Sequence, residues 1–340
     1  MALWISRPCL NCLALFVLAA LPLAGYCQAD GLPTRTTYAR KIALLIGTGH
    51  YQAGRGKGAF RDLPAVANDL NAMGLALTSI GFQTKIYSDL DVPGDSSLSF
   101  RSPLVAGESP VLPVTTLHIA RIVEQLLDSL EQSTERTLLV VYLSGHGGIL
   151  GKSDRVVALP DSEPGSPDSF FRVRKLLNSL AERAPNTDKY LIVDACAGPL
   201  GKRSDDLVTR IDEELPPYVF SSRLGESSYI DPEKNQSVFT FYLVQAIVGA
   251  KELNLLESDG TLDTDAIRAY LYAKVPLHAK TEQKRRLAAI GAPLVQHPFG
   301  STQNLSLTVI RDTVPSPPPS AGRDEIDRYT RALFESHYPK

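Results

Sequence analysis

Short, continuous runs of apolar residues constrain the fold of this chain more than any other feature. A run that is apolar at every position, without polar alternation, predicts a strand that is buried on both faces. Such strands occur in parallel sheets that helices cover on both sides. The runs span residues 41–47, 137–143 and 190–193, with weaker candidates at 83–87 and 218–221.

The segments between these runs have the three- and four-residue apolar spacing of amphipathic helices. Strands that alternate with helices predict an α/β fold, with a mostly parallel central sheet and helices on both faces. Sheets of this kind bind ligands beyond the carboxyl ends of their strands. The expected helices cover residues 63–77, 119–130, 171–180, 238–248 and 264–275, the last capped by Asp263 or Thr264.

Composition excludes several classes of protein. Of the 340 residues, 44% are hydrophobic and 21% are charged, which is ordinary for a globular chain. The formal net charge is −2, so there is no basic excess to hold a phosphate backbone, and we expect no nucleic-acid partner. No group of Cys and His has zinc-ligand spacing, and no glycine-rich loop has nucleotide-binding spacing.

Residues 1–29 have the pattern of a secretory signal peptide: a single charge at Arg7, an apolar segment over 10–21, and small residues up to Ala29. We therefore expect cleavage after Ala29 or Gly25 and export, to the periplasm or outside the cell, with no transmembrane span in the mature chain. Residues 23–27 nearly match a lipoprotein signal, so a lipid anchor stays open, as does an uncleaved N-terminal anchor.

The remaining chain is expected to form one folded domain over residues 30–312. Residues 313–322 include four prolines and two serines in close succession and predict an extended linker. Residues 323–340 are expected to form a short helical tail.

Reactive side chains follow two of the buried runs. Segment 144–148 contains His146 between glycines, and segment 194–198 contains Cys196, the only cysteine after the first 27 residues. Both segments lie at the carboxyl end of a predicted strand, so the thiol and the imidazole are expected to converge. A thiol assisted by an imidazole can attack a carbonyl. The backbone N–H groups of Gly147 and Cys196 are the expected donors to the resulting oxyanion.

Segments 143–147 and 192–198 resemble the paired signatures of caspase-like cysteine peptidases, in which the His precedes the Cys by about 50 residues. The closer resemblance is to metacaspases and their bacterial relatives, the orthocaspases. It extends over residues 38–312 and implies a caspase-like fold and cysteine endopeptidase activity, with His146 and Cys196 as the catalytic residues. Ala197 departs from the pattern, because relatives often have a polar residue or histidine there. Further matching segments are 41–47, 63–70, 238–243, 259–262 and 296–298.

The resemblance also implies a substrate class. In metacaspases, two aspartates line the pocket for the residue before the scissile bond, and they correspond to Asp69 and Asp194 here. Two carboxylates in one pocket favour a protein or peptide substrate with Arg or Lys at that position. The basic residues of segment 200–217 then make this loop a candidate for self-cleavage, although an exposed charged loop has the same composition.

No cofactor is expected to be required. Calcium activates several metacaspases, and loop carboxylates are the oxygen ligands that calcium prefers. The sequence has no fixed-spacing calcium motif, so surface acids are the simpler interpretation. The candidate ligands are Asp161, Asp168, Asp205 and Asp206.

Two other functions remain open at this point. One is a caspase-like binding or sensor module with weak chemistry. The other is a peptidase of the same clan with a different specificity, such as a legumain-like or gingipain-like enzyme.

Overall fold

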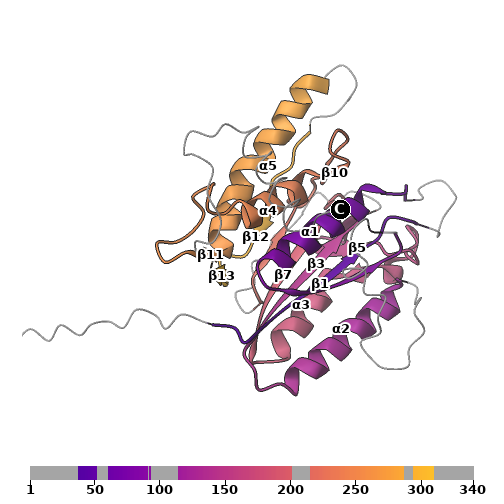
Figure 1. The fold of residues 1–340 in the computed structure, drawn as a ribbon. Coiled ribbons are helices and arrows are strands. Elements are labelled where there is room, and N and C mark those ends of the chain that lie inside the picture. Colours follow the sequence, from indigo (N-terminus) through magenta and orange to yellow (C-terminus); the bar gives the residue numbers. More distant parts are fainter. Residues whose placement is uncertain are drawn as a thin grey trace, which may run out of the picture. The chain divides into compact units, whose positions relative to one another are not determined.

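A six-stranded sheet forms the centre of the structure, a computed structural model (Figure 1). The structure describes residues 37–51, 60–90, 92, 114–200, 215–286 and 294–309. The described residues all belong to one unit, which begins at Thr37. The predicted signal peptide, the linker 313–322, the tail 323–340 and residues 201–214 of the predicted self-cleavage loop lie outside the described residues.

All five predicted runs are strands of this sheet, whose order is β12-β8-β7-β3-β1-β2. Strands β1, β2, β3, β7 and β8 are parallel, and the edge strand β12 runs antiparallel to β8. The two strands that precede the predicted catalytic residues, β3 and β7, are neighbours in the middle. The bounds are β1 Arg40–Gly47, β2 Gln83–Ser88, β3 Thr137–Ser144, β7 Thr187–Asp194, β8 Tyr218–Phe220 and β12 Phe299–Gly300.

Alternate residues of the central strands face two separate hydrophobic cores. In β3, Val140 and Tyr142 pack with helices α1 (Ala65–Ser79), α4 (Val238–Val248) and α5 (Thr264–Arg286). Val141 and Leu143 face the other core, which α2 (Thr116–Glu131) and α3 (Val173–Glu182) cover. Figure 1 shows α1, α4 and α5 on one side of the sheet, with α2 and α3 on the other. The apolar runs are continuous because both faces are buried.

The predicted helices are all present, and the bounds of four of them differ from the expected ones. The helix expected from residue 171 begins at Val173, because Phe171 and Arg172 form a short strand, β6, that pairs with β5 (Asp154–Val157). Helix α5 continues past Pro276 to Arg286, and the buried Ala279 packs its later part on the protein. Its N-terminus is capped as expected, since the Asp263 carboxylate accepts a bond from the N–H of Ala266.

Three small antiparallel sheets lie outside the central one, and none was predicted because each strand has two to four residues. Strands β4 (Gly147–Leu150) and β5 form a hairpin just beyond β3, and β6 joins it. This hairpin, β6, α3 and β7 lie between His146 and Cys196 in the sequence. The other pairs are β9 (Ile230–Asp231) with β10 (Gln236–Ser237), and β11 (Thr261–Asp263) with β13 (Ser306–Val309).

None of the helices in the described part of the chain combines the length and the apolarity that crossing a bilayer requires.

Two leucines of α2 allow a matched test of the packing. The side chain of Leu127 is fully buried, whereas Leu117 is 70% exposed. We expect Leu127→Ala to lower the free energy of unfolding by about 2–5 kcal/mol, because the core cannot fill the cavity that is left. Leu117→Ala should change it by less than about 0.5 kcal/mol. Urea denaturation measures both values, and equal losses would contradict this packing.

Candidate active site

The pairing of β3 with β7 brings the predicted catalytic segments to one edge of the sheet. Ser144 at the end of β3 lies opposite Asp194 at the end of β7. The N–H of Gly145 donates to the carbonyl of Asp194 over 3.2 Å, so the two segments are still bonded where they leave the sheet. His146 and Cys196 each follow two residues after these paired positions. The structure thus brings together the segments that the sequence predicted to converge.

The imidazole of His146 is fixed from several sides. The backbone N–H of His146 donates to the hydroxyl of Tyr51 at 2.8 Å, and that hydroxyl donates to the carbonyl of Thr48 at 2.9 Å. The ring stacks on Phe60 with centroids 5.0 Å apart and lies 4.9 Å from the ring of Tyr51. These contacts hold the ring at the edge of the sheet.

A backbone carbonyl selects the tautomer of this imidazole. Nε2 of His146 lies 2.8 Å from the carbonyl oxygen of Arg61. A carbonyl only accepts, so Nε2 is the protonated nitrogen and the lone pair is on Nδ1. Burial lowers the pKa of His146, and the bond to Arg61 partly opposes that shift. The ring is therefore a neutral base near pH 7.

The thiol of Cys196 is part-buried and neutral in the free protein. Burial raises its pKa, and the charge of Asp194 raises it further. The N–H of Ser228, which donates to Sγ over 3.3 Å, acts in the opposite direction. Because a thiolate is not favoured before substrate binds, the thiol needs a base to become a nucleophile.

Two glycines allow the backbone to approach closely here. Gly145 has φ of 155°, and a Cβ there would lie 2.9 Å from the hydroxyl oxygens of Thr48 and Tyr51. A Cβ on Gly147 would lie 2.7 Å from Cβ of Ala195 and 2.9 Å from the carbonyl oxygen of Cys196. Gly147 therefore packs directly on the segment that contains Cys196. That its N–H and the N–H of Cys196 bind an oxyanion stays a prediction.

The two aspartates predicted to select substrate are buried together beneath this edge, where Asp69 is 2% and Asp194 is 4% exposed. Oδ1 of Asp69 accepts from the N–H of Ser237 at 2.9 Å, and Oδ2 accepts from the hydroxyl of Ser144 at 3.4 Å. Burial raises the pKa of Asp69 well above its ordinary value, and the charge of Asp194 adds to the shift. The two carboxyl groups thus interact electrostatically, and a proton on Asp69 is favoured.

Hydroxyl groups satisfy the carboxylate of Asp194. Ser228 donates to Oδ1 at 2.7 Å, and Thr240 of α4 donates to Oδ2 at 2.6 Å. The hydroxyl of Tyr142 lies 2.6 Å from that of Thr240 and is therefore the donor to it. This chain fixes Asp194 between the nucleophile segment and the first turn of α4.

The candidate calcium ligands do not form a site among the described residues. The carboxylate of Asp161 accepts from the N–H of Thr116, and Asp168 pairs with Arg172. No group of three or more potential metal ligands lies together within the described ranges. Asp205 and Asp206 lie outside those ranges, so calcium binding stays a prediction.

Comparison with known proteins tests the resemblance read from the sequence. The family model of the caspase domain matches residues 40–264, about two-thirds of the chain. The chain belongs to the caspase-domain family. The match includes Asp69, His146, Asp194 and Cys196. No curated protein matches the sequence.

A solved structure confirms the caspase fold. The crystal structure of caspase-1 from Spodoptera frugiperda is similar with a TM-score of 0.53 and 16% identity, over 81% of this chain and 92% of that one. The structure of pro-Sf-caspase-1 gives a TM-score of 0.49 and 13% identity, over 81% of this chain and 96% of that one. The likeness at this identity shows the fold alone. Membership of the family places the chain among caspase-like peptidases.

Sequence reasoning missed the residues that hold this caspase-domain site together. Tyr51, Ser228 and Thr240 position the segments of His146, Cys196 and Asp194, respectively. Thr240 lies in segment 238–243, which resembles the family, and this is a signal that could have found it. Tyr51 lies four residues beyond β1 and Ser228 eight residues beyond β8, and neither belongs to a motif, so only the folded chain reveals their contacts.

The buried carboxyl of Asp69 predicts a pH-dependent stability. Its folded pKa is raised above the ordinary 3.8. Between these two values the folded state holds a proton that the unfolded state releases, so stability falls as pH rises through this window. Asp69→Asn removes that loss and keeps the shape of the side chain. We expect urea unfolding to show a stabilisation that grows as pH rises above about 4.

Asp62→Asn is the matched control for this measurement. The N–H of Tyr51 and the ring of His50 lower the pKa of Asp62. Removing this carboxylate should therefore destabilise the protein increasingly as pH rises. A gain from Asp69→Asn that is the same at every pH would contradict the assignment.

Proposed function

We propose that this caspase-domain protein is an exported cysteine endopeptidase that cleaves after Arg or Lys, with His146 and Cys196 as its catalytic dyad. One observation carries the proposal. The register of β3 and β7 ends both strands together, so that a thiol and an imidazole with a free Nδ1 lone pair follow at the same edge. Parallel α/β sheets bind their ligands at this edge.

The chemistry follows from the protonation of the two groups. Nδ1 of His146 accepts the thiol proton while Sγ of Cys196 attacks the scissile carbonyl carbon, forming the S–C bond. The carbonyl oxygen becomes an oxyanion, to which the N–H groups of Gly147 and Cys196 donate. His146 then returns the proton to the leaving amine as the C–N bond breaks. Water, with His146 as base, hydrolyses the thioester and restores the thiol.

Asp69 and Asp194 would select the basic side chain before the cut. Burial and, after it, the charge of Asp194 raise the pKa of Asp69. A cation between the two carboxyl groups would offset the repulsion and lower that pKa. The attraction between a carboxylate and a guanidinium or ammonium is strongest where water is excluded, and both carboxyl groups are buried. A neutral guest gains neither effect.

The pattern of residues 1–29 supports export, and the basic residues Lys202, Arg203 and Arg210 make segment 200–217 the place where such an enzyme would cut itself. Calcium would act through loop carboxylates and takes no part in the chemistry proposed here. A lipid anchor at Cys27 remains a variant of the export proposal.

A second function, a caspase-like binding module with weak chemistry, is favoured by one observation. The pKa of Cys196 is raised, and a thiol-based enzyme more often lowers it. A thiol-reactive peptide probe that ends in Arg distinguishes the two: the enzyme is labelled at Cys196 in a time-dependent reaction, and the binding module is not.

Cys196→Ala should abolish the hydrolysis of fluorogenic peptides that end in Arg, because the nucleophile is lost while the packing is kept. For the wild-type protein, the acid limb of kcat/KM should lie below pH 6.5, since the pKa of His146 is lowered from that value. Ser153→Ala, on the turn between β4 and β5, is the control and should retain activity. Equal turnover by Cys196→Ala would exclude the dyad.

A pair of isosteric reporters tests the selection by charge. The wild-type protein should cleave an Arg reporter far better than the same peptide with citrulline, which has the same shape and no charge. Asp194→Asn or Asp69→Asn should reduce this Arg-to-citrulline ratio of kcat/KM, on the order of 10-fold to 100-fold.

Asp62→Asn is the control and should leave the Arg-to-citrulline ratio unchanged, because Asp62 is an exposed carboxylate outside the proposed pocket. Wild-type protein that cleaves both reporters equally would rule out the basic specificity while leaving the dyad intact.

A further inference from the structure

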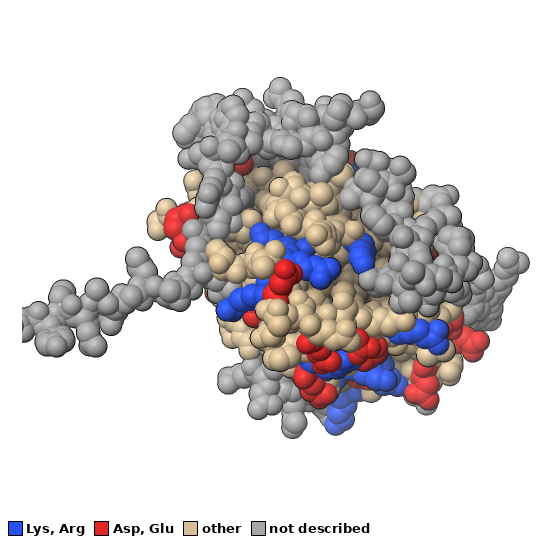
Figure 2. Space-filling view, turned by 60° about the horizontal axis from the view of Figure 1, so that its bottom comes forward, with Lys and Arg blue, Asp and Glu red and all other residues tan. Residues whose placement is uncertain are grey.

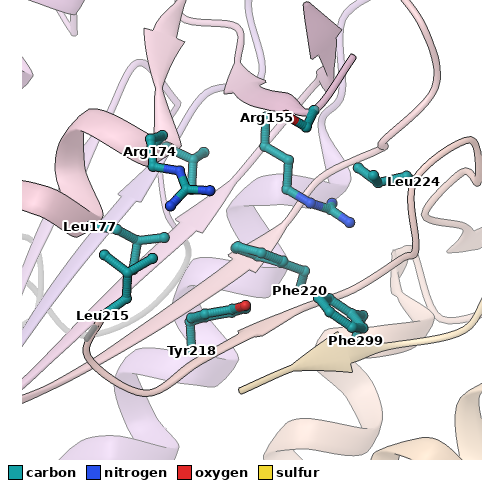
Figure 3. Close-up of a pocket in the computed structure, with 10 residues that line it drawn as sticks. Arg155, Arg174, Leu177, Leu215, Tyr218, Phe220, Leu224 and Phe299 are labelled. Carbon is teal, nitrogen blue, oxygen red and sulfur yellow. The ribbon is translucent and has the colours of Figure 1, made fainter. Parts of the chain in front are cut away.

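A cavity with a mixed lining opens between the hairpin strand β5, helix α3 and strands β8 and β12 (Figure 3). The cavity has a volume of about 50 Å³ and is open to solvent on one side. Neither His146 nor Cys196 lines it, so it is separate from the proposed active site. The residues that line it include Arg155, Arg174, Leu177, Tyr218, Phe220 and Phe299.

Arg155 is the unusual member of this lining. Its guanidinium lies 4.4 Å above the ring centroid of Phe220, and Nη2 donates to the carbonyl of Ser222 at 2.8 Å. Burial lowers its pKa to about 10. Such a cation is ordinarily paired with a carboxylate, because removing a charge from water is costly.

Within the described ranges no carboxylate forms an ion pair with Arg155. Glu226 is close enough to act on its charge, yet both oxygens of that carboxylate have other donors. Oε1 lies 2.9 Å from Nδ1 of His297, and Oε2 accepts from the N–H groups of His297 and Arg223. A guanidinium has five N–H donors, and a single one of those of Arg155 has a protein acceptor in the described residues.

The remaining donors face the cavity. Figure 3 shows the guanidinium of Arg155 turned into the space above Phe220, with the guanidinium of Arg174 on the other side. Apart from Ser153, aromatic and aliphatic side chains form the rest of the wall. In Figure 2, which brings the α2 and α3 side forward, basic side chains gather near the middle of the face.

We propose that this cavity binds a small carboxylate with an apolar body, held by the guanidinium of Arg155 and by the rings of Tyr218, Phe220 and Phe299. The planar N–H groups of an arginine match the two oxygens of a carboxylate. The three aromatic rings and Leu177 would pack against the apolar body of such a ligand. The ligand would supply the counter-ion that Arg155 does not find among the described residues.

The site is one residue from the segment of the proposed nucleophile. The carbonyl of Ser222 accepts from Arg155, and the hydroxyl of Ser222 donates to the carbonyl of Ala195 at 3.3 Å. Binding is nevertheless independent of peptidase activity. It is therefore measured on the full-length Cys196→Ala protein, and its failure would leave the proposed function untouched.

The decisive comparison uses two probes of one shape, 3-phenylpropanoate and 3-phenylpropanamide, in isothermal titration at low salt. We expect the carboxylate to bind at least tenfold more tightly than the amide, and its affinity to fall as salt is added. Absence of binding by both probes, or equal affinity, would overturn the proposal and leave Arg155 as a structural cation.

Variants of three arginines locate the binding. Arg155→Met should remove the preference for the carboxylate, and Arg174→Met should weaken it. Arg223→Met is the control. Arg223 follows Ser222, whose carbonyl binds Arg155, but it does not line the cavity. Unchanged carboxylate binding by folded Arg155→Met would refute the site. Should that variant not fold, Arg155→Lys, which keeps the charge but loses the planar pair of donors, must bind more weakly.

Discussion

The pairing of β3 with β7 is the interaction on which the rest of the site depends. The two strands are paired along their full length, and both are buried on each face. A slip of one residue would turn every side chain to the opposite core, which two different sets of helices fill. Packing therefore fixes the register, and the register places Ser144 opposite Asp194. His146 and Cys196 are held at one edge because hydrophobic side chains further back in the sheet allow a single alignment.

Asp194 connects the two halves of the site electrostatically. Burial raises the pKa of both Asp69 and Cys196, and the charge of Asp194 adds to each shift. Ser228 strengthens the connection, because its hydroxyl donates to Asp194 while its N–H donates to the thiol sulfur. In the proposed mechanism, a cationic side chain beside Asp194 offsets the charge that disfavours the thiolate. Substrate selection and activation of the nucleophile then favour each other.

Much of the fold could be predicted because the pattern that specifies it is local. The apolar runs at 41–47 and 137–143 indicate strands buried on two sides, and the family signatures follow the strand ends. The helix expected at 171 begins instead at Val173, because pairing with β5 takes two residues into a strand. No local propensity encodes that choice, since the partner strand is 14 or more residues away in the chain.

The sequence by itself determined the five parallel strands, the helices, the nucleophile and base candidates, and their location at strand ends, since these depend on residue type and spacing. Only the tertiary structure decided which nitrogen of His146 is protonated and how Tyr51, Ser228 and Thr240 hold the site. It also decided that Arg155 faces a cavity and has no ion-paired carboxylate in the described part of the chain. Those features depend on atoms that are distant in the chain and meet only when the sheet and its helices pack. Burial, which sets the pKa values, likewise exists only in the folded state.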